Sequence, residues 1–364
     1  MVKKIKLFEP IIGKEESKKI IQVLKSGFWA SGSGIGNVKS FEEKFQQYIG
    51  SKSCVAVNSG TAALHLALSL SDIKGKEVIL PSLSFVSTAH SIVYNGGKPV
   101  FADIDPKTLC IDPEKVIEKI SNKTKIILPV HFAGIPANLT KLKKISKDHN
   151  LILIDDAAHA CGASYKNKKI GSINEFTCFS FHPVKNLAMP TGGLISINNK
   201  NFEKNKKQLE SKRWCGITDR KNVKYDVKEI GWNYYMNEFS AAIGLVQLKK
   251  LDSMNKRKKI ISKMYHKEIN LDNKMPIEDG SSHHFYWIRV KNRDKFMQNM
   301  QNVGIETGIH YRPIHKLSLY KQKERLTVTE NIEKEIVSIP NHPNLKTNDV
   351  EFIVKNINKF FLRN

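Results

Sequence analysis

The sequence has few cysteines, and their arrangement excludes a disulfide framework. Its 364 residues contain five cysteines, an odd number, spaced widely and without a CxxC pair. Such a set is typical of reduced thiols in a cytosol and lacks the spacing of a zinc site. We therefore expect a cytoplasmic protein with no metal centre.

Long apolar runs, internal repeats and low-complexity segments are also missing. The basic first ten residues are not followed by an apolar stretch, so neither a signal peptide nor a membrane-spanning helix is predicted. The apolar content of 40% is that of an ordinary globular protein. Since 364 residues is long for a single core, we expect a large domain over residues 1–245 and a smaller one over 246–364.

Acidic residues are scarce relative to basic ones. There are 35 acidic and 59 basic residues, which gives a formal net charge of +24. An excess of this size can indicate nucleic-acid or membrane binding. Here it is mostly lysine spread through predicted helices such as residues 141–147 and 249–258, with no aromatic-interleaved basic motif. We interpret it as a solvated surface that helps to attract an anionic substrate, and expect binding to neither nucleic acid nor membrane.

Short β-branched runs alternate with helical segments through the first two-thirds of the chain. This alternation predicts an α/β fold with a parallel sheet and right-handed crossovers. No G-x-G-x-x-G follows the first run, which argues against a classical dinucleotide-binding fold. The predicted strands are 54–57, 77–81, 99–105, 125–130, 151–155, 177–181 and 192–197, and the predicted helices are 14–26, 38–49, 60–70, 85–94, 139–149 and 201–212.

The C-terminal third predicts a smaller α/β unit. Residues 214–231 read as a mobile basic loop, and a long helix over 237–265 leads into the second unit. The elements expected there are strands at 285–290 and 307–311 and helices at 293–303 and 349–361.

The most informative stretch runs from residue 151 to 193. A short apolar strand ends in Asp155 and Asp156, and Lys185 follows a second short strand. Since carboxyl ends of parallel strands meet at the ligand-binding edge of a sheet, the lysine can reach the carboxylates. This is the pair that pyridoxal phosphate needs: the lysine forms the Schiff base, and the aspartate keeps the pyridinium nitrogen protonated.

Two other segments are weaker indicators of a site. Ser59, Gly60 and Thr61 open a predicted helix, where they form either an anion-binding N-terminus or an ordinary cap. Phe28 and Trp29 lie in a loop over residues 28–34, either as loop packing or as a wall of the site.

The chain resembles the DegT/DnrJ/EryC1/StrS family of pyridoxal-phosphate-dependent aminotransferases, which act on nucleotide-linked keto sugars. The resemblance runs nearly end to end and implies fold type I, aspartate-aminotransferase-like: a large, mixed, mostly parallel sheet domain with a smaller α/β C-terminal domain. It is carried by ordered motifs at residues 58–64, 81–89, 99–105, 155–160, 179–186, 231–234 and 308–313.

The resemblance also implies roles for individual residues. Lys185 would hold the cofactor and later move protons between substrate and cofactor carbons. Asp156 would pair with the pyridine nitrogen, Asp155 would be structural, and His159 would sit near the phenolic oxygen. The remaining expected cofactor contacts are Gly60, Thr61 and Ser180 to the phosphate, Phe85 stacked on the ring, and Asn233 reaching the phosphate of the neighbouring subunit.

The implied reaction has two halves. An amino group, most simply from L-glutamate, would leave pyridoxamine phosphate on the enzyme and then pass to the keto carbon of a dTDP-, UDP- or GDP-linked deoxysugar. The implied enzyme is a homodimer with shared sites, serving bacterial surface glycans such as the O-antigen of lipopolysaccharide. The candidates to hold the nucleotide sugar are Phe28, Trp29, His310, Tyr311, Arg312 and His315.

Some positions depart from the family pattern. Thr191 stands where relatives commonly carry an acid, and Tyr235 where they carry Arg or Asn. Some relatives replace the lysine by His and become dehydratases, a branch that Lys185 argues against. A cyclitol acceptor and a cofactor-binding regulatory protein of the same fold are the open alternatives, and retention of Asp156, His159, Ser180 and Lys185 disfavours the second.

Overall fold

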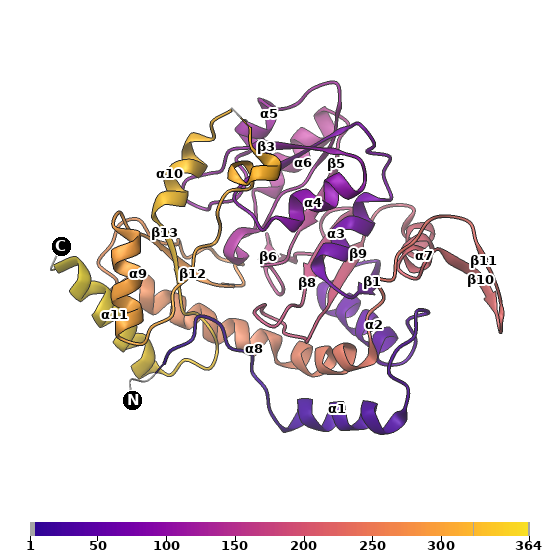
Figure 1. Ribbon diagram of the computed structural model, residues 1–364, viewed down its shortest axis with the longest axis horizontal. Helices are drawn as coiled ribbons and strands as arrows, with labels where there is room; N and C mark the ends of the chain where they lie inside the picture. The colour runs from indigo at the N-terminus through magenta and orange to yellow at the C-terminus, as the bar shows by residue number, and fades with distance from the viewer. Residues whose placement is uncertain (1–3, 323, 363–364) are drawn as a thin grey trace.

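A seven-stranded mixed sheet lies at the centre of the computed structural model, which describes residues 4–322 and 324–362 (Figure 1). Its strand order is β1-β9-β8-β5-β4-β2-β3. Only β9 runs against its neighbours, so six strands end at one edge and β9 begins there. The predicted mostly parallel α/β sheet is confirmed. The strands are β1 (Ser53–Val57), β2 (Glu77–Pro81), β3 (Lys98–Ala102), β4 (Thr124–Ile127), β5 (Ile152–Asp156), β8 (Phe176–Ser180) and β9 (Gly193–Ile197).

Both faces of the sheet are covered, which explains why its strands read as nearly continuous apolar runs. Along β1, Val55 and Val57 enter the core on one face, whereas Cys54 and Ala56 enter the core on the other. The helices up to the end of the sheet are α1 (Lys14–Ser26), α2 (Asn37–Ile49), α3 (Gly60–Leu68), α4 (Ser87–Tyr94), α5 (Pro113–Ile117), α6 (Leu139–Asp148) and α7 (Phe202–Lys212), with a 3-10 turn, η1 (Phe132–Gly134).

Local capping sets several of these helix boundaries. The Ser59 hydroxyl accepts a hydrogen bond from the Ala62 backbone N–H at 3.1 Å, so α3 starts directly after β1. Gly27 ends α1 with a φ of 67°, a backbone conformation that favours glycine. The Ser59 cap turns the chain at the sheet edge where the candidate site lies.

A smaller sheet and three helices form the C-terminal part of the chain. It follows α8 (Glu238–Glu268), a single long helix that runs below the central sheet, with α1 beneath it (Figure 1). The N-terminal segment returns to this part, since Ile5 pairs with Ile305. The expected boundary between residues 245 and 246 falls inside α8, and the two-domain division stays a prediction. The other elements are β12 (Tyr286–Arg289), β13 (Ile336–Ile339), α9 (Arg293–Asn302), η2 (Ile314–Lys316), η3 (Ser318–Tyr320), α10 (Thr327–Glu335) and α11 (Thr347–Leu362).

The structure corrects two expectations. The presumed loop over residues 214–231 contains an antiparallel hairpin, β10 (Ile217–Lys221) with β11 (Lys224–Val227), which projects from the body (Figure 1). Most of its residues are exposed, including Tyr225 and Val227, so the sequence lacks the pattern of a half-buried strand. Its turn is supplied by Asn222, which has a φ of 55°. The expected strand over residues 307–311 is only a single bridge between Gly308 and Ser338.

Several elements were not expected from the sequence. They include α5, α10, β13 and the small hairpin of β6 (Ser164–Tyr165) with β7 (Lys168–Lys169). Strand β13 follows α10 with no Gly or Pro between them, so no turn signal marks its start. In the described part of the chain no helix combines the length and apolar character needed to cross a membrane.

Candidate active site

A cavity of about 360 Å³ opens at the edge where the parallel strands end. Its walls come from the connections that follow β1, β2, β4, β5 and β8 and from the segment before β9, as expected for a ligand site in an α/β sheet. The structure brings these predicted residues together around it: Gly60, Thr61, Phe85, Asp156, His159, Ser180, Lys185, His310 and Tyr311.

Asp155 and Asp156 end the same strand but face opposite sides, because side chains alternate along a strand. Asp156 lines the cavity and accepts hydrogen bonds from Thr88 Oγ1 at 2.9 Å and the Ala158 backbone N–H at 3.1 Å. Burial raises the pKa of Asp156, and these two donors act against that rise. Asp155 is fully buried and accepts from Asn174 Nδ2 at 2.8 Å to each carboxylate oxygen, as expected of a structural carboxylate.

Lys185 reaches the cavity from the turn that follows β8. Its backbone N–H donates to the His182 carbonyl at 2.8 Å, which closes this turn. Desolvation of the amine lowers the pKa of Lys185 to about 8, and Asp156 pulls it in the opposite direction. A larger uncharged fraction near neutral pH makes this amine a better nucleophile and proton acceptor than a surface lysine.

His159 forms the wall next to Asp156. Its Nε2 lies 3.0 Å from the Tyr311 hydroxyl, and its ring stacks on His284 with centroids 4.7 Å apart. Its Nδ1 is buried and has no hydrogen-bond partner among the described residues. Burial holds the pKa of His159 well below its usual value, and so the ring is neutral with one polar atom available to a ligand.

The start of α3 forms an anion cradle in the wall of the cavity that Lys185 also lines. Gly60 and Thr61 are the first residues of this helix, and the first N–H groups of a helix have no intrahelical acceptor. A Cβ at Gly60 would lie 2.7 Å from Ser180 Cβ, so only glycine lets the helix start approach β8 this closely. The Ser180 hydroxyl adds a further polar group to the same wall.

Comparisons with known proteins identify the fold. The model of the DegT/DnrJ/EryC1/StrS aminotransferase family matches residues 10–358. The chain belongs to this family. It is 33% identical over 372 residues to the spore coat polysaccharide biosynthesis protein SpsC of Bacillus subtilis, covering 95% of this chain and 94% of the relative.

Solved structures of sugar aminotransferases agree with this assignment. Helicobacter pylori PseC, an aminotransferase in pseudaminic acid biosynthesis, superposes with a TM-score of 0.93 at 28% identity over the full length of both chains. The pyridoxal-phosphate form of the putative sugar aminotransferase Spr1654 of Streptococcus pneumoniae gives a TM-score of 0.92 at 27% identity, covering 99% of this chain and 99% of that one.

This family member is a pyridoxal-phosphate-dependent aminotransferase of fold type I. Its own residues suit the cofactor. The cavity joins a carboxylate, a primary amine, an unpartnered imidazole nitrogen and a helix N-terminus, which match the ring nitrogen, aldehyde, phenolic oxygen and phosphate of pyridoxal phosphate.

Five predicted site residues lie outside the cavity that a single chain forms. Phe28 and Trp29 are 38% and 51% exposed, and Asn233 and Arg312 are also exposed. His315 is buried, with its Nδ1 2.6 Å from Ser82 Oγ. Their roles stay predictions.

The two departures from the family pattern lie at different distances from the site. Thr191 lines the cavity, and its hydroxyl donates to the Asn58 carbonyl, which ties the turn before β9 to the end of β1. Tyr235 is half-buried and does not line the cavity.

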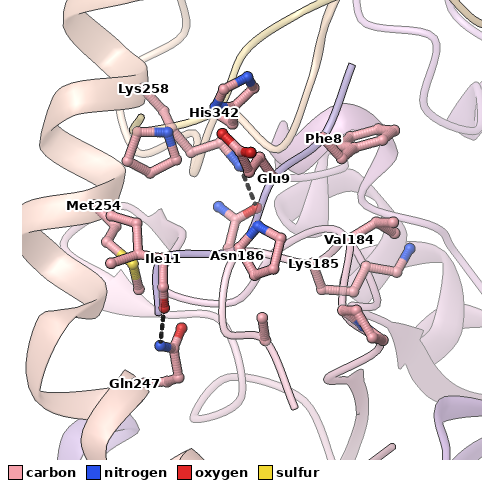
Figure 2. Close-up of a pocket in the computed structure, with 14 residues that line it drawn as sticks. Phe8, Glu9, Ile11, Val184, Lys185, Asn186, Gln247, Met254, Lys258 and His342 are labelled. Carbon is pink, nitrogen blue, oxygen red and sulfur yellow. Dashed lines mark hydrogen bonds between the residues drawn. The ribbon is translucent and has the colours of Figure 1, made fainter. Parts of the chain in front are cut away.

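Residues near the site were also missed, among them Phe8, which lines the cavity, and four residues that lie behind its walls. Thr88 falls inside a family motif, and Asn186 directly follows Lys185, so both had a signal in the sequence. Lys258 and His284 had none, because they reach Asn186 only through tertiary packing. Lys258 does so from α8 (Figure 2), and His284 from the segment before β12.

Proposed function

We propose that this enzyme moves the amino group of L-glutamate to the keto carbon of a nucleotide-linked deoxysugar. The observation that carries the proposal is that Lys185, Asp156 and the start of α3 face one cavity in a member of this family. The relatives that act in spore coat polysaccharide and pseudaminic acid biosynthesis support a sugar acceptor and a role in surface glycans such as an O-antigen.

The side chains divide the chemistry between them. Bound pyridoxal phosphate would supply an electron sink for the bonds at the substrate carbon. Lys185 Nζ would attach the cofactor. The same amine would then accept the proton from the amino acid carbon and deliver it to the cofactor carbon. The Asp156 carboxylate would accept the hydrogen bond of the ring nitrogen and balance its charge.

The remaining contacts hold the cofactor in place. Gly60, Thr61 and Ser180 would donate hydrogen bonds to the phosphate. Phe85, which is 57% exposed at the cavity mouth, would cover the ring. His159 Nδ1 would meet the phenolic oxygen, since that nitrogen is the one left without a partner.

The sugar nucleotide would enter past His310 and Tyr311. Burial lowers the pKa of His310 to about 4, so this ring offers a neutral hydrogen-bonding group. The net charge of +24 favours approach of an anionic nucleotide. In the assembled enzyme, the proposed contacts to the sugar nucleotide also include Phe28, Trp29, Arg312 and His315.

A homodimer with shared sites is part of the proposal. The apolar face of α1 is open on a single chain, with Ile21 and Leu24 51% and 54% exposed and Ile12 beside it 73% exposed. This face adjoins an apolar cavity of about 470 Å³ that includes Pro183 and Met189, close to the Lys185 turn. Contiguous exposed apolar surface is typical of a protein interface. A cytoplasmic location, also proposed, agrees with the five free thiols.

The first test is the visible absorption spectrum of the purified protein before and after addition of L-glutamate, with Lys185→Ala beside it. We expect a yellow band that glutamate bleaches in the wild type and that is absent or unresponsive in the variant. A screen of nucleotide keto sugars, with a keto-cyclitol as the competing acceptor, then identifies the substrate. A band that ignores every amino donor would favour the regulatory alternative.

A further inference from the structure

Tyr311 and His159 form a hydrogen-bonded pair on the wall of the cavity. The Tyr311 hydroxyl lies 3.0 Å from His159 Nε2, and the two rings are nearly parallel, with an interplanar angle of 18°. Both side chains line the cavity that Lys185 also lines. The pair joins the segment after β5 to the C-terminal part of the chain, so its geometry depends on tertiary packing.

The imidazole of His159 is held in one orientation by the rings around it. It stacks on His284 with ring centroids 4.7 Å apart. Phe285 and Phe132 make T-shaped contacts with it, with centroids 5.4 Å and 6.1 Å away. The two nitrogens therefore occupy fixed places: Nε2 lies at the Tyr311 hydroxyl, and Nδ1 is buried without a hydrogen-bond partner among the described residues.

The pair has two protons to place, one on the phenol and one on the imidazole. Burial holds the pKa of His159 well below its usual value, and the nearby Lys185 acts in the same direction, so the ring carries a single proton near neutral pH. Burial also raises the pKa of Tyr311, so its hydroxyl keeps its proton. The part of the chain that the structure describes offers this hydroxyl no other hydrogen-bond partner.

Only one arrangement of these protons leaves each of them with an acceptor once a ligand binds. If the phenol donates to Nε2, the imidazole proton is on Nδ1 and is available to the ligand. In the reverse arrangement Nε2 donates to the Tyr311 oxygen, and the hydroxyl proton then has no acceptor among the described residues. Nδ1 would also present a lone pair, which cannot bond an oxygen that itself only accepts. The hydrogen bond at one histidine nitrogen thus selects the proton on the other.

We propose that Tyr311 is a positioning residue whose hydroxyl donates to His159 Nε2 and so fixes the imidazole proton on Nδ1. His159 is then a permanent donor to the phenolic oxygen of the cofactor and needs no rearrangement when pyridoxal phosphate binds. The inference rests on the proposed function, in which His159 Nδ1 meets that oxygen. It gives Tyr311 a role separate from contact with the sugar nucleotide.

The direct test is the tautomer of His159 in the full-length apoenzyme, prepared by removing the cofactor. In protein labelled with heavy nitrogen at its histidines, nuclear magnetic resonance distinguishes a protonated ring nitrogen from a bare one. Loss of a signal in His159→Gln identifies His159. We expect the proton on Nδ1 in the wild type, and we expect this preference to be lost in Tyr311→Phe, which keeps the ring without the hydroxyl.

Two outcomes of that measurement would overturn the proposal. One is a proton that stays on Nδ1 in Tyr311→Phe. The other is a proton that already lies on Nε2 in the wild type, and this result needs no variant, so the proposal is decided even if Tyr311→Phe does not fold.

Cofactor binding gives a second readout. Tyr311→Phe should bind pyridoxal phosphate about 3- to 10-fold more weakly, as expected for the loss of one hydrogen bond. The pH midpoint of its visible band should rise by about half a unit to one unit, because a donor at the phenolic oxygen stabilises the deprotonated form. Tyr320→Phe is the matched control: it removes a hydroxyl that lies 2.5 Å from His90 Nδ1, does not line the cavity, and should change neither quantity.

His159→Gln separates the tautomer from a packing effect. An amide nitrogen is always a donor, so in this background the Tyr311 hydroxyl has no tautomer to select. Tyr311→Phe should then change the affinity and the band midpoint much less than it does beside His159. Equal changes in the two backgrounds would mean that Tyr311 acts through packing, and the proposal would be rejected.

Failure of the proposed function would look different. A protein that forms no visible band with pyridoxal phosphate would reject the proposed function together with the role of His159 toward the cofactor. A band that glutamate bleaches, in a protein whose His159 carries its proton on Nε2, would reject only the role of Tyr311.

Discussion

Thr88 holds the carboxylate of Asp156 across the gap between α4 and β5. The hydrogen bond from Thr88 Oγ1 to Asp156 Oδ2 is 2.9 Å long, and Ser84 Oγ lies 2.8 Å from the same hydroxyl. All three side chains are buried. Burial favours the protonated acid, so the hydrogen bond from Thr88 helps to keep Asp156 charged, as its proposed role opposite the ring nitrogen requires.

Replacing Thr88 by Val should therefore weaken cofactor binding. The change removes the donor but keeps the shape, and a hydrogen bond to a charged group contributes about 1.5–3 kcal/mol, which corresponds to roughly 10- to 150-fold in affinity. Titration of the apoenzyme with pyridoxal phosphate measures this loss. Thr88→Ser retains the hydroxyl and should bind within a few fold of the wild type; equal losses in both variants would contradict the assignment.

Substitutions at the adjacent aspartates should separate stability from chemistry. Asp155→Ala leaves the donors of Asn174 and Thr177 without their acceptor in the core, so the free energy of unfolding should fall by about 1–3 kcal/mol or more. Asp156→Asn should reduce transamination strongly with a smaller change in stability, since it removes the negative charge facing the cofactor. Urea unfolding and the rate of bleaching by glutamate measure the two effects, and a reversed pattern would exchange the two roles.

The apoenzyme should become more stable as the pH rises through the range in which the two buried lysines titrate. Their folded pKa values are about 7 for Lys258 and about 8 for Lys185, both below the ordinary lysine value of about 10.4. Between these limits the unfolded chain binds more protons than the folded chain. The stability of the wild-type apoenzyme relative to that of Lys258→Met therefore increases with pH. Below pH 7 both states are charged and the difference levels off.

Urea unfolding of the wild-type and Lys258→Met apoenzymes at several pH values checks this prediction. The difference between the two proteins cancels contributions from other groups, including the buried cysteines. A difference that does not vary from pH 7 to 10 would mean that Lys258 does not titrate in this window.

Shared sites predict complementation between two inactive variants. Lys185→Ala and Asn233→Ala chains should each give little activity alone. If Asn233 serves the partner's site, a mixed dimer contains one site with both defects and one with neither. Random mixing should then restore about a quarter of the wild-type activity per chain. No recovery in a confirmed mixture would place both residues in the same site.

Much of the site was predictable because its residues are ordered by the strands. Asp156 and Lys185 each follow a short apolar strand, and parallel strands carry such residues to a common edge. Their meeting around one cavity agrees with that prediction. The residues that support them were harder to predict. Thr88 and Asp156 are 68 positions apart, and Lys258 is one of many lysines on a helix whose buried face is visible only after packing.

The sequence by itself determined the α/β class, the family and the strand-end placement of Lys185 and Asp156, because these follow from local patterns of polar and apolar residues. The tertiary structure decided which polar groups are stripped of water and which atoms meet. It placed Asp155 in the core and Asp156 in the cavity, left His159 Nδ1 without a partner, and set Lys258 behind Asn186. Desolvation and hydrogen bonding depend on contacts between distant segments, and those contacts are what tune the amines and carboxylates of this enzyme.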